Sequence, residues 1–117
     1  MKGFFEDYNG VSIELDIDDS IINEIMDCIE KGEIPFVRLE NGKGDYMQCA
    51  GKGNKFTVEL RVVDINSFKH FVIGTSLQSK VWKMIYCSVG PIRVLEHEVL
   101  SNSDAKWLLT SFYKEVG

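Results

Sequence analysis

The chain has 117 residues, of which 44% are hydrophobic and 26% charged, and this is the composition of one globular domain with room for a hydrophobic core. No apolar run reaches the about 20 residues that a membrane-spanning helix needs, and the first residues lack the apolar core and cleavage site of a secretory signal. We therefore expect a single-domain cytoplasmic protein that is not bound to a membrane. Its three widely spaced cysteines are expected to be reduced, neither paired in disulfides nor arranged around zinc.

The net charge of −5 is unevenly distributed along the chain. Residues 1–33 hold ten acids against two lysines, a net charge of −8, whereas the remainder holds eight acids and eleven bases, a net charge of +3. An acidic surface repels nucleic acid and favours a basic partner. The simpler interpretation, a helix with a solvated charged face, stays open.

The first third of the sequence predicts a β-hairpin followed by a helix. Asn9-Gly10 separates two apolar-rich runs and predicts strands over 3–8 and 11–17, because both turn positions of such a hairpin favour positive φ. An irregular arm leading into one strand is the alternative. Asp19 or Ser20 can cap the following helix, whose apolar stripe begins at Ile21 and Ile22 and which ends at Gly32.

Four short strands are predicted next, over 36–40, 46–50, 56–63 and 68–73, joined by short turns into an antiparallel meander. Side-chain parity tests this arrangement. If Val37 faces Cys49 and Leu39 faces Met47, then Met47 can face Leu60 and Leu60 can face Phe71, and all of these are apolar. The opposite face then carries Arg38, Gln48, Glu59, Arg61 and His70.

The last third predicts two more helices around a strand. Leu77, Val81 and Val89 recur at helical spacing within residues 76–90, and Gly90-Pro91 would end that helix. Residues 92–98 read as a strand, and Ser103 can cap a C-terminal amphipathic helix. The expected fold is α+β: a mainly antiparallel, twisted sheet with a central four-stranded meander and about three helices, packed mostly on one face. Whether the N-terminal strands join the meander stays open.

The polar face of the meander is the first candidate site. In the predicted register Arg61 lies opposite His70, and a carboxylate such as Glu59 with an imidazole can form a general acid–base pair. Mixed charges on a solvated sheet face also arise from cross-strand pairing for stability alone. We favour a binding surface over a catalytic one.

Four other motifs give no catalytic or metal site. His97-Glu98 resembles the start of a zinc-protease helix, but the second histidine is missing and the segment reads as a strand. Cys49 is a candidate nucleophile, yet parity places it on the core side, away from His70. The GKGNK segment joins two strands as a turn and lacks the phosphate-loop pattern. Phe36, Tyr46 and Phe68 could form a sheet platform on which nucleic-acid bases stack. The sequence signature of such platforms is absent, however, and the net charge of the chain is negative, so we do not favour that role. We expect no enzyme activity, no cofactor, no metal and no direct nucleic-acid binding.

The run FVRLENGKGDYMQCAGKGNKFTVELRV, continued by FKHFVIG, resembles the small bacterial immunity proteins of polymorphic-toxin and contact-dependent growth inhibition systems. The residues that match are Gln48, the V-E-x-R segment with Glu59 and Arg61, and His70 between aromatic residues. The predicted helices that contain Trp82 and Trp107 fit the same layout. The resemblance is loose and covers residues 36–90.

The resemblance implies a protein that binds one cognate toxin domain and blocks its active site. If that toxin is a cationic nuclease, the carboxylates of residues 1–33 are the first expected contact, Asp16, Asp18 and Asp19 above all, extended by Glu6 and Tyr8. The polar face with Gln48, Glu59, Arg61 and His70 is the second. Two alternatives remain: a small regulatory or ligand-binding module that uses the polar face, and a minor hydrolase or transferase that uses Glu59 and His70.

Overall fold

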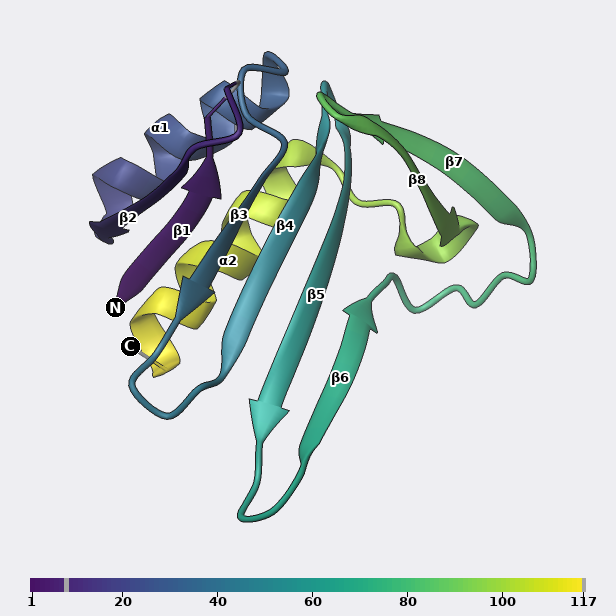
Figure 1. Cartoon of the computed structure of the whole chain (residues 1–117). Helices are drawn as coiled ribbons and strands as arrows, with labels where there is room; N and C mark the ends of the chain where they lie inside the picture. Colours follow the sequence, from purple (N-terminus) through teal and green to yellow (C-terminus); the bar gives the residue numbers. More distant parts are fainter. Residues whose placement is uncertain (8, 117) are drawn as a thin grey trace.

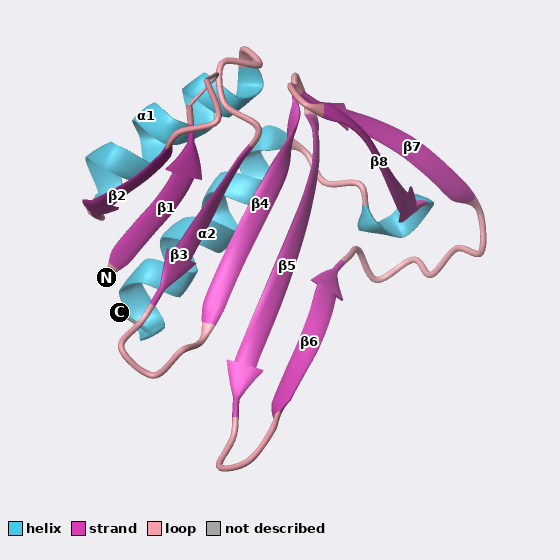
Figure 2. Cartoon of the chain, viewed as in Figure 1, coloured by secondary structure: helices cyan, strands magenta, loops and turns pink. Residues whose placement is uncertain are grey.

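The computed structural model describes residues 1–7 and 9–116. Its main element is a six-stranded antiparallel sheet with the strand order β2-β1-β3-β4-β5-β6, and two helices, α1 and α2, lie together behind this sheet (Figure 1, Figure 2). A two-stranded sheet, β7–β8, projects from one end. The elements are β1 Lys2–Glu6, β2 Ser12–Asp16, α1 Asp19–Glu30, β3 Phe36–Glu40, β4 Tyr46–Lys52, β5 Lys55–Val63, β6 Phe68–Ile73, β7 Trp82–Cys87, β8 Gly90–Leu95, the short 3₁₀ turn η1 Glu96–Glu98, and α2 Asn102–Val116.

The N-terminal hairpin is confirmed, and its turn forms differently from the prediction. Among the described residues of this turn only Gly10 has a positive φ, of 78°. The carboxylate of Asp7 also stabilises the turn: its Oδ1 accepts hydrogen bonds from the backbone N–H groups of Asn9 and Val11, at 2.9 Å each. A short side chain that bonds to its own backbone stabilises a turn in this way.

The two N-terminal strands join the meander, which the sequence left open. β1 pairs with β3, so that Phe4 lies opposite Arg38 and Phe5 opposite Val37. β2 then forms the outer edge beyond β1. The sheet therefore has six strands, with the predicted meander as its larger part.

The register predicted for the meander is confirmed at every pair. Val37 lies opposite Cys49 and Leu39 opposite Met47, and Leu60 lies between Met47 and Phe71. The turn between β4 and β5 needs glycine: Gly51 has a φ of 155°, and a Cβ there would collide with the backbone of Lys55 and Phe56. The GKGNK segment therefore forms the turn between β4 and β5 and not a phosphate loop.

The predicted helix over 76–90 is wrong. Residues 82–87 form β7, in which Trp82, Met84 and Tyr86 are exposed while Ile85 is buried, and this is the period of a strand. Leu77 and Val81, which set the helical spacing, are both exposed. The aromatic and β-branched residues of this segment favour a strand, and Gly90 begins β8 instead of ending a helix. The structure thus has two α-helices where about three were expected, and Cys87 lies in a strand.

The ends of the remaining elements also correct details of the prediction. Asp18 caps α1, in place of Asp19 or Ser20, because its Oδ1 accepts from the backbone N–H of Ile21 at 2.8 Å. At the start of α2, the Oγ of Ser101, two residues before the expected Ser103, accepts from the N–H of Asp104 at 3.1 Å. The strand expected over 92–98 ends at Leu95, where η1 begins.

The hydrophobic core lies between the two helices and one face of the sheet. Each layer contributes side chains that are almost completely buried. These are Ile22, Met26 and Ile29 from α1, Val37, Leu39, Cys49, Phe56 and Val58 from the sheet, and Ala105 and Leu109 from α2. Because the helices cover only this face, the opposite face of the sheet is free to carry polar side chains.

Candidate partner-binding face

We call the face of the six-stranded sheet that points away from α1 and α2 the open face; Figure 1 looks onto it. Its side chains form two rows that cross all six strands, because the registers of the five strand pairs are in phase. One row runs Asp16, Lys2, Glu40, Tyr46, Arg61, His70. The other runs Glu14, Phe4, Arg38, Gln48, Glu59, Val72.

Aromatic rings and guanidinium groups alternate across this face from β1 to β6, passing from one row to the other. We call the series Phe4, Arg38, Tyr46, Arg61, Phe68 the arginine–aromatic ladder. The Cζ of Arg38 lies 5.4 Å from the ring centre of Phe4 and 5.6 Å from that of Tyr46. The Cζ of Arg61 lies 5.5 Å from the ring centre of Tyr46 and 4.7 Å from that of Phe68. Each contact is within the range of a cation–π interaction.

The ladder holds its two arginines by their ring contacts. The Nε atoms of Arg38 and Arg61 are shielded from solvent and have no hydrogen-bond partner among the described residues. Arg38 Nε lies 3.0 Å from Glu40 Oε1, which is an ion pair by distance, but the N–H does not point at the carboxylate. A shielded N–H without a partner is unusual in a surface arginine, and it indicates that the rings fix both side chains in place.

Two further contacts between ionisable side chains lie on the open face. His70 Nε2 is 3.5 Å from Glu59 Oε2, with both side chains partly exposed. At the opposite edge, Lys2 Nζ donates to Asp16 Oδ1 at 2.8 Å. The hydrogen bond from Lys2, followed by its charge, lowers the pKa of Asp16, and the pKa of Lys2 is raised by the same bond.

The structure brings most of the predicted site residues onto this one face and leaves others elsewhere. Gln48, Glu59, Arg61 and His70 lie together as the parity predicted, and Glu6 and Asp16 share their face through β1 and β2. Asp18 caps α1, and Asp19 lies 3.9 Å from Lys114 of α2, so these two belong to the helical layer. Tyr8 lies outside the described residues.

The β7–β8 hairpin closes one end of the open face, and sequence reasoning missed it. Its inner side buries Ile85 and Val94, and Thr57 of β5 is only 5% exposed. A cleft of about 220 Å³ lies where Ile92 of β8 approaches the sheet, lined by Gln48, Ala50, Thr57, Glu59 and Ile92. The outer side of the β7–β8 hairpin exposes Trp82, Met84, Tyr86 and Arg93.

Part of the ladder could have been found in the sequence. The confirmed register already places Tyr46 opposite Arg61. Phe4, however, meets Arg38 only because β1 pairs with β3, and the 29 residues 7–35, which include β2 and α1, separate the two strands in sequence. Pairing between distant strands leaves no local signal.

The other residues considered for chemistry, Cys49 and His97, lie away from the open face. Cys49 is fully buried among the core residues, and this burial raises the pKa of its thiol to about 12. His97 serves the backbone: its Nδ1 accepts from the N–H of Ser79 at 3.0 Å and its carbonyl from the N–H of Thr75 at 2.7 Å. Within residues 1–7 and 9–116, no cluster of His, Cys, Asp or Glu has the arrangement of a metal site.

Comparison with protein-family models, with curated proteins and with solved structures finds no match for this chain. None of the helices in the described part of the chain has the length and apolar character that crossing a bilayer requires.

Proposed function

We propose that this protein is a protein-binding domain of the immunity type, which neutralises a cognate toxin domain by docking the open face over the active site of that toxin. The observation that carries the proposal is the arginine–aromatic ladder. Arg, Tyr and Phe are enriched in the cores of protein–protein interfaces, where rigid rings and stacked guanidinium groups bury much area at little entropic cost. The ladder presents these residues on a flat sheet face, already held in position.

The charges around the ladder indicate the chemistry of the partner. On β1 and β2 the open face carries three carboxylates, those of Glu6, Glu14 and Asp16, against one base, Lys2. On β3 to β6 it carries Glu40 and Glu59 against Arg38, Arg61 and His70, and the register adds Lys52 and Lys55 at the turn between β4 and β5. The carboxylates are concentrated toward β2, next to the acidic N-terminal third. A cationic toxin, such as a nuclease with a basic cleft, would be steered to this edge of the sheet and would then pack on the ladder.

The immunity assignment rests on the resemblance over residues 36–90, and one part of that resemblance has changed. The segment with Trp82 forms a strand and not the helix that the layout implied. The strands with Gln48, Glu59, Arg61 and His70 keep their places. The three cysteines are all free, as suits a reducing compartment, and we place the protein in the cytoplasm.

The cleft beside Ile92 gives a second candidate, a module that binds a small ligand between the hairpin and the sheet. Its volume of about 220 Å³ is below the roughly 300–1,000 Å³ of pockets that hold drug-sized ligands. A flat ladder with an acidic edge fits a protein surface better.

The proposal requires that the gene next to this one encode a toxin, and the experiment uses the variable C-terminal domain of that toxin. Its affinity is measured by calorimetry for the unmodified protein, for Arg61→Ala and for the matched control Arg93→Ala. Arg93 also stacks on a ring, with its Cζ 4.3 Å from the ring centre of Trp82, but it lies on the outer side of the β7–β8 hairpin. We expect Arg61→Ala to weaken binding by about 2 kcal/mol, roughly 30-fold, and Arg93→Ala to leave it unchanged. Equal affinities for all three proteins, or no binding of the toxin domain, would refute the proposal.

A further inference from the structure

The strand β6 forms an exposed edge of the main sheet. It is hydrogen-bonded to β5 on one side only, and Figure 1 shows no other element beside its outer edge. Three of its six residues are exposed apolar side chains: Phe68 at 57%, Phe71 at 47% and Val72 at 38% exposure. The strand has no proline and no acidic residue, and Lys69 is the one permanently charged side chain that protects it against pairing with another strand.

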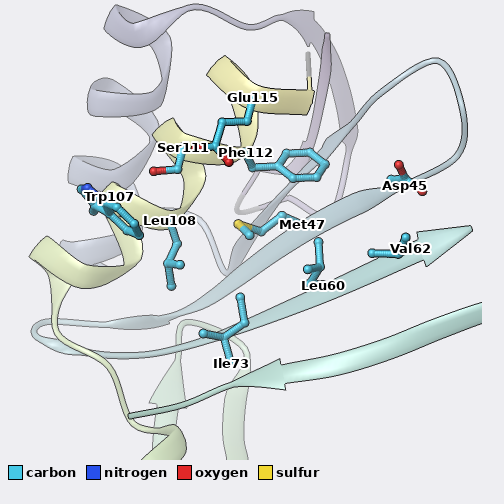
Figure 3. Close-up of a pocket in the computed structure, with 10 residues that line it drawn as sticks. All are labelled: Asp45, Met47, Leu60, Val62, Ile73, Trp107, Leu108, Ser111, Phe112 and Glu115. Atoms are coloured by element: carbon cyan, nitrogen blue, oxygen red, sulfur yellow. The ribbon is translucent and has the colours of Figure 1, made fainter. Parts of the chain in front are cut away.

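An apolar groove runs beside β6 on the helical side of the sheet. The groove has a volume of about 390 Å³ and lies between α2 and the strands β4, β5 and β6. Figure 3 shows Leu108 and Phe112 of α2 on one side of it and Met47, Leu60 and Ile73 of the sheet on the other. Phe71 pairs with Leu60 and therefore lies on this same face. Ile73 lines the groove and Phe71 continues it toward the edge of the sheet, whereas Phe68 and Val72 lie on the open face.

The other edge of the sheet differs in a way that selects between possible occupants. β2 carries Glu14 and Asp16 and is followed at once by Asp18 and Asp19. If β2 paired with β2 of a second copy about its centre, Glu14 would face Glu14 across the axis, and like charges placed directly opposite are destabilising. β6 carries no acid and one lysine, Lys69, so its two-fold pairing has a register in which neither Lys69 nor His70 faces a like group.

We propose that two copies of this chain associate through β6, in antiparallel register, and join their main sheets into one sheet of twelve strands. The two-fold axis stands perpendicular to the sheet, and this requires the axis to pass through a residue position, because directly opposite residues point to the same face. With the axis at Phe71, Phe71 faces Phe71 of the second copy. His70 then faces Val72, and Lys69 faces Ile73.

The alternative axis at His70 is less favourable. It would place the two imidazoles opposite each other and Lys69 opposite Phe71, and it would leave Ile73 opposite the polar Ser67. The axis at Phe71 brings two half-exposed aromatic rings together, and aromatic pairs across strands are among the stabilising ones. It also lets the apolar grooves of the two copies meet. The dimer edge and the arginine–aromatic ladder share Phe68, but Phe71 at the axis points to the helical face of the sheet, away from the ladder. A change at Phe71 therefore tests the dimer without altering the ladder, and Arg61→Ala tests the ladder without altering the axis.

The first experiment measures molar mass by analytical ultracentrifugation over a wide range of protein concentration. We expect a concentration-dependent mass that rises to twice the 13.3 kDa of one chain. Phe71→Lys should weaken self-association at least about tenfold, because two lysines would then face each other at the axis. The matched control is Val89→Lys, which introduces the same charge at another exposed apolar residue, on the tip of the β7–β8 hairpin. Circular dichroism verifies that both variants fold.

The second experiment tests the register by disulfide cross-linking. In a background with Cys28→Ser and Cys87→Ser, the variant Phe71→Cys places one thiol on each side of the axis. Opposite residues in an antiparallel pair have Cα atoms about 4.5–5.5 Å apart, within the about 4.4–6.8 Å that a disulfide spans. Under mild oxidation we expect Phe71→Cys to form a covalent dimer faster than Tyr86→Cys on the outer side of the hairpin. A monomer at every concentration, or a dimer that Phe71→Lys leaves intact and Phe71→Cys fails to cross-link, would overturn the proposal.

Discussion

The position of Cys49 shows that this residue is part of the hydrophobic core and not of a catalytic site. It lies in β4 opposite Val37 and Val58, fully buried in the core, while His70 lies on the open face of the same sheet. Burial raises the pKa of its thiol from the ordinary value of 9.0 to about 12, because the core does not solvate a thiolate. A thiol in this state is a small apolar side chain and not a nucleophile.

This burial predicts a pH dependence of stability. Above pH 9 the thiol of the unfolded chain loses its proton while the folded one keeps it until about pH 12, so stability that is present below pH 9 is lost as the pH rises through this window. Cys49→Ala should be less stable near neutral pH by about 1–2 kcal/mol because it leaves a small cavity. The difference between the two proteins should narrow by about 1.4 kcal/mol per pH unit above pH 9. Urea denaturation at several pH values measures it, and a constant difference would contradict the burial.

At the scale of elements, the contrast between the meander and the β7–β8 hairpin explains what the sequence could predict. In the meander, alternating apolar residues and short turns specify each register locally, and all the predicted pairs were right. In residues 76–90, Leu77, Val81 and Val89 occur at helical spacing by coincidence, since all three are exposed. The alternation of Trp82, Met84 and Tyr86 was the better signal. A short hairpin that packs on only one side shows few alternations between buried and exposed residues. The coincidental helical spacing extends over more of the segment and was therefore the easier pattern to recognise.

The segment between β6 and β7 depends on His97 for its conformation. His97 Nδ1 accepts from the N–H of Ser79, and Gly74 packs so closely on the imidazole that a Cβ there would lie 2.8 Å from its Cδ2. His97→Ala should remove the acceptor and increase amide hydrogen exchange at Ser79 by about tenfold, the equivalent of roughly 1.4 kcal/mol of local protection. His97→Asn keeps a side-chain acceptor and should restore part of the protection. Unchanged exchange at Ser79 in His97→Ala would show that this hydrogen bond does not hold the segment.

At the scale of the whole molecule, the sheet joins two surfaces that the sequence treated as separate. Glu6 and Asp16 come from the acidic N-terminal hairpin, while Gln48, Glu59, Arg61 and His70 come from the meander. They share one face because β1 pairs with β3, although β2 and α1 lie between these two strands in the sequence. Parity within the meander predicted half of this face, and the other half depends on a pairing of distant strands that no local pattern specifies.

The acidic edge of the open face predicts how a cationic partner associates. Glu14→Lys on β2 should lower the association rate constant at low salt by about tenfold and reduce its salt dependence, because steering acts over roughly a Debye length, about 10 Å at moderate salt. Glu24→Lys makes the same change in net charge on an exposed position of α1, in the helical layer, and should have a smaller effect. Stopped-flow mixing with the toxin domain measures both. Equal effects of the two variants would mean that only net charge matters and not the edge at β2.

The most direct test of the open face uses the three arginines of the chain, each of which stacks on an aromatic ring. Their Nε–H groups give separate signals in a nitrogen–proton NMR spectrum, and the signals can be assigned by single substitutions. On addition of the toxin domain that the proposed function requires, we predict that the Nε–H signals of Arg38 and Arg61 shift or broaden while that of Arg93 stays in place. A complex in which Arg38 and Arg61 keep their free positions would contradict the docking of a partner on the ladder.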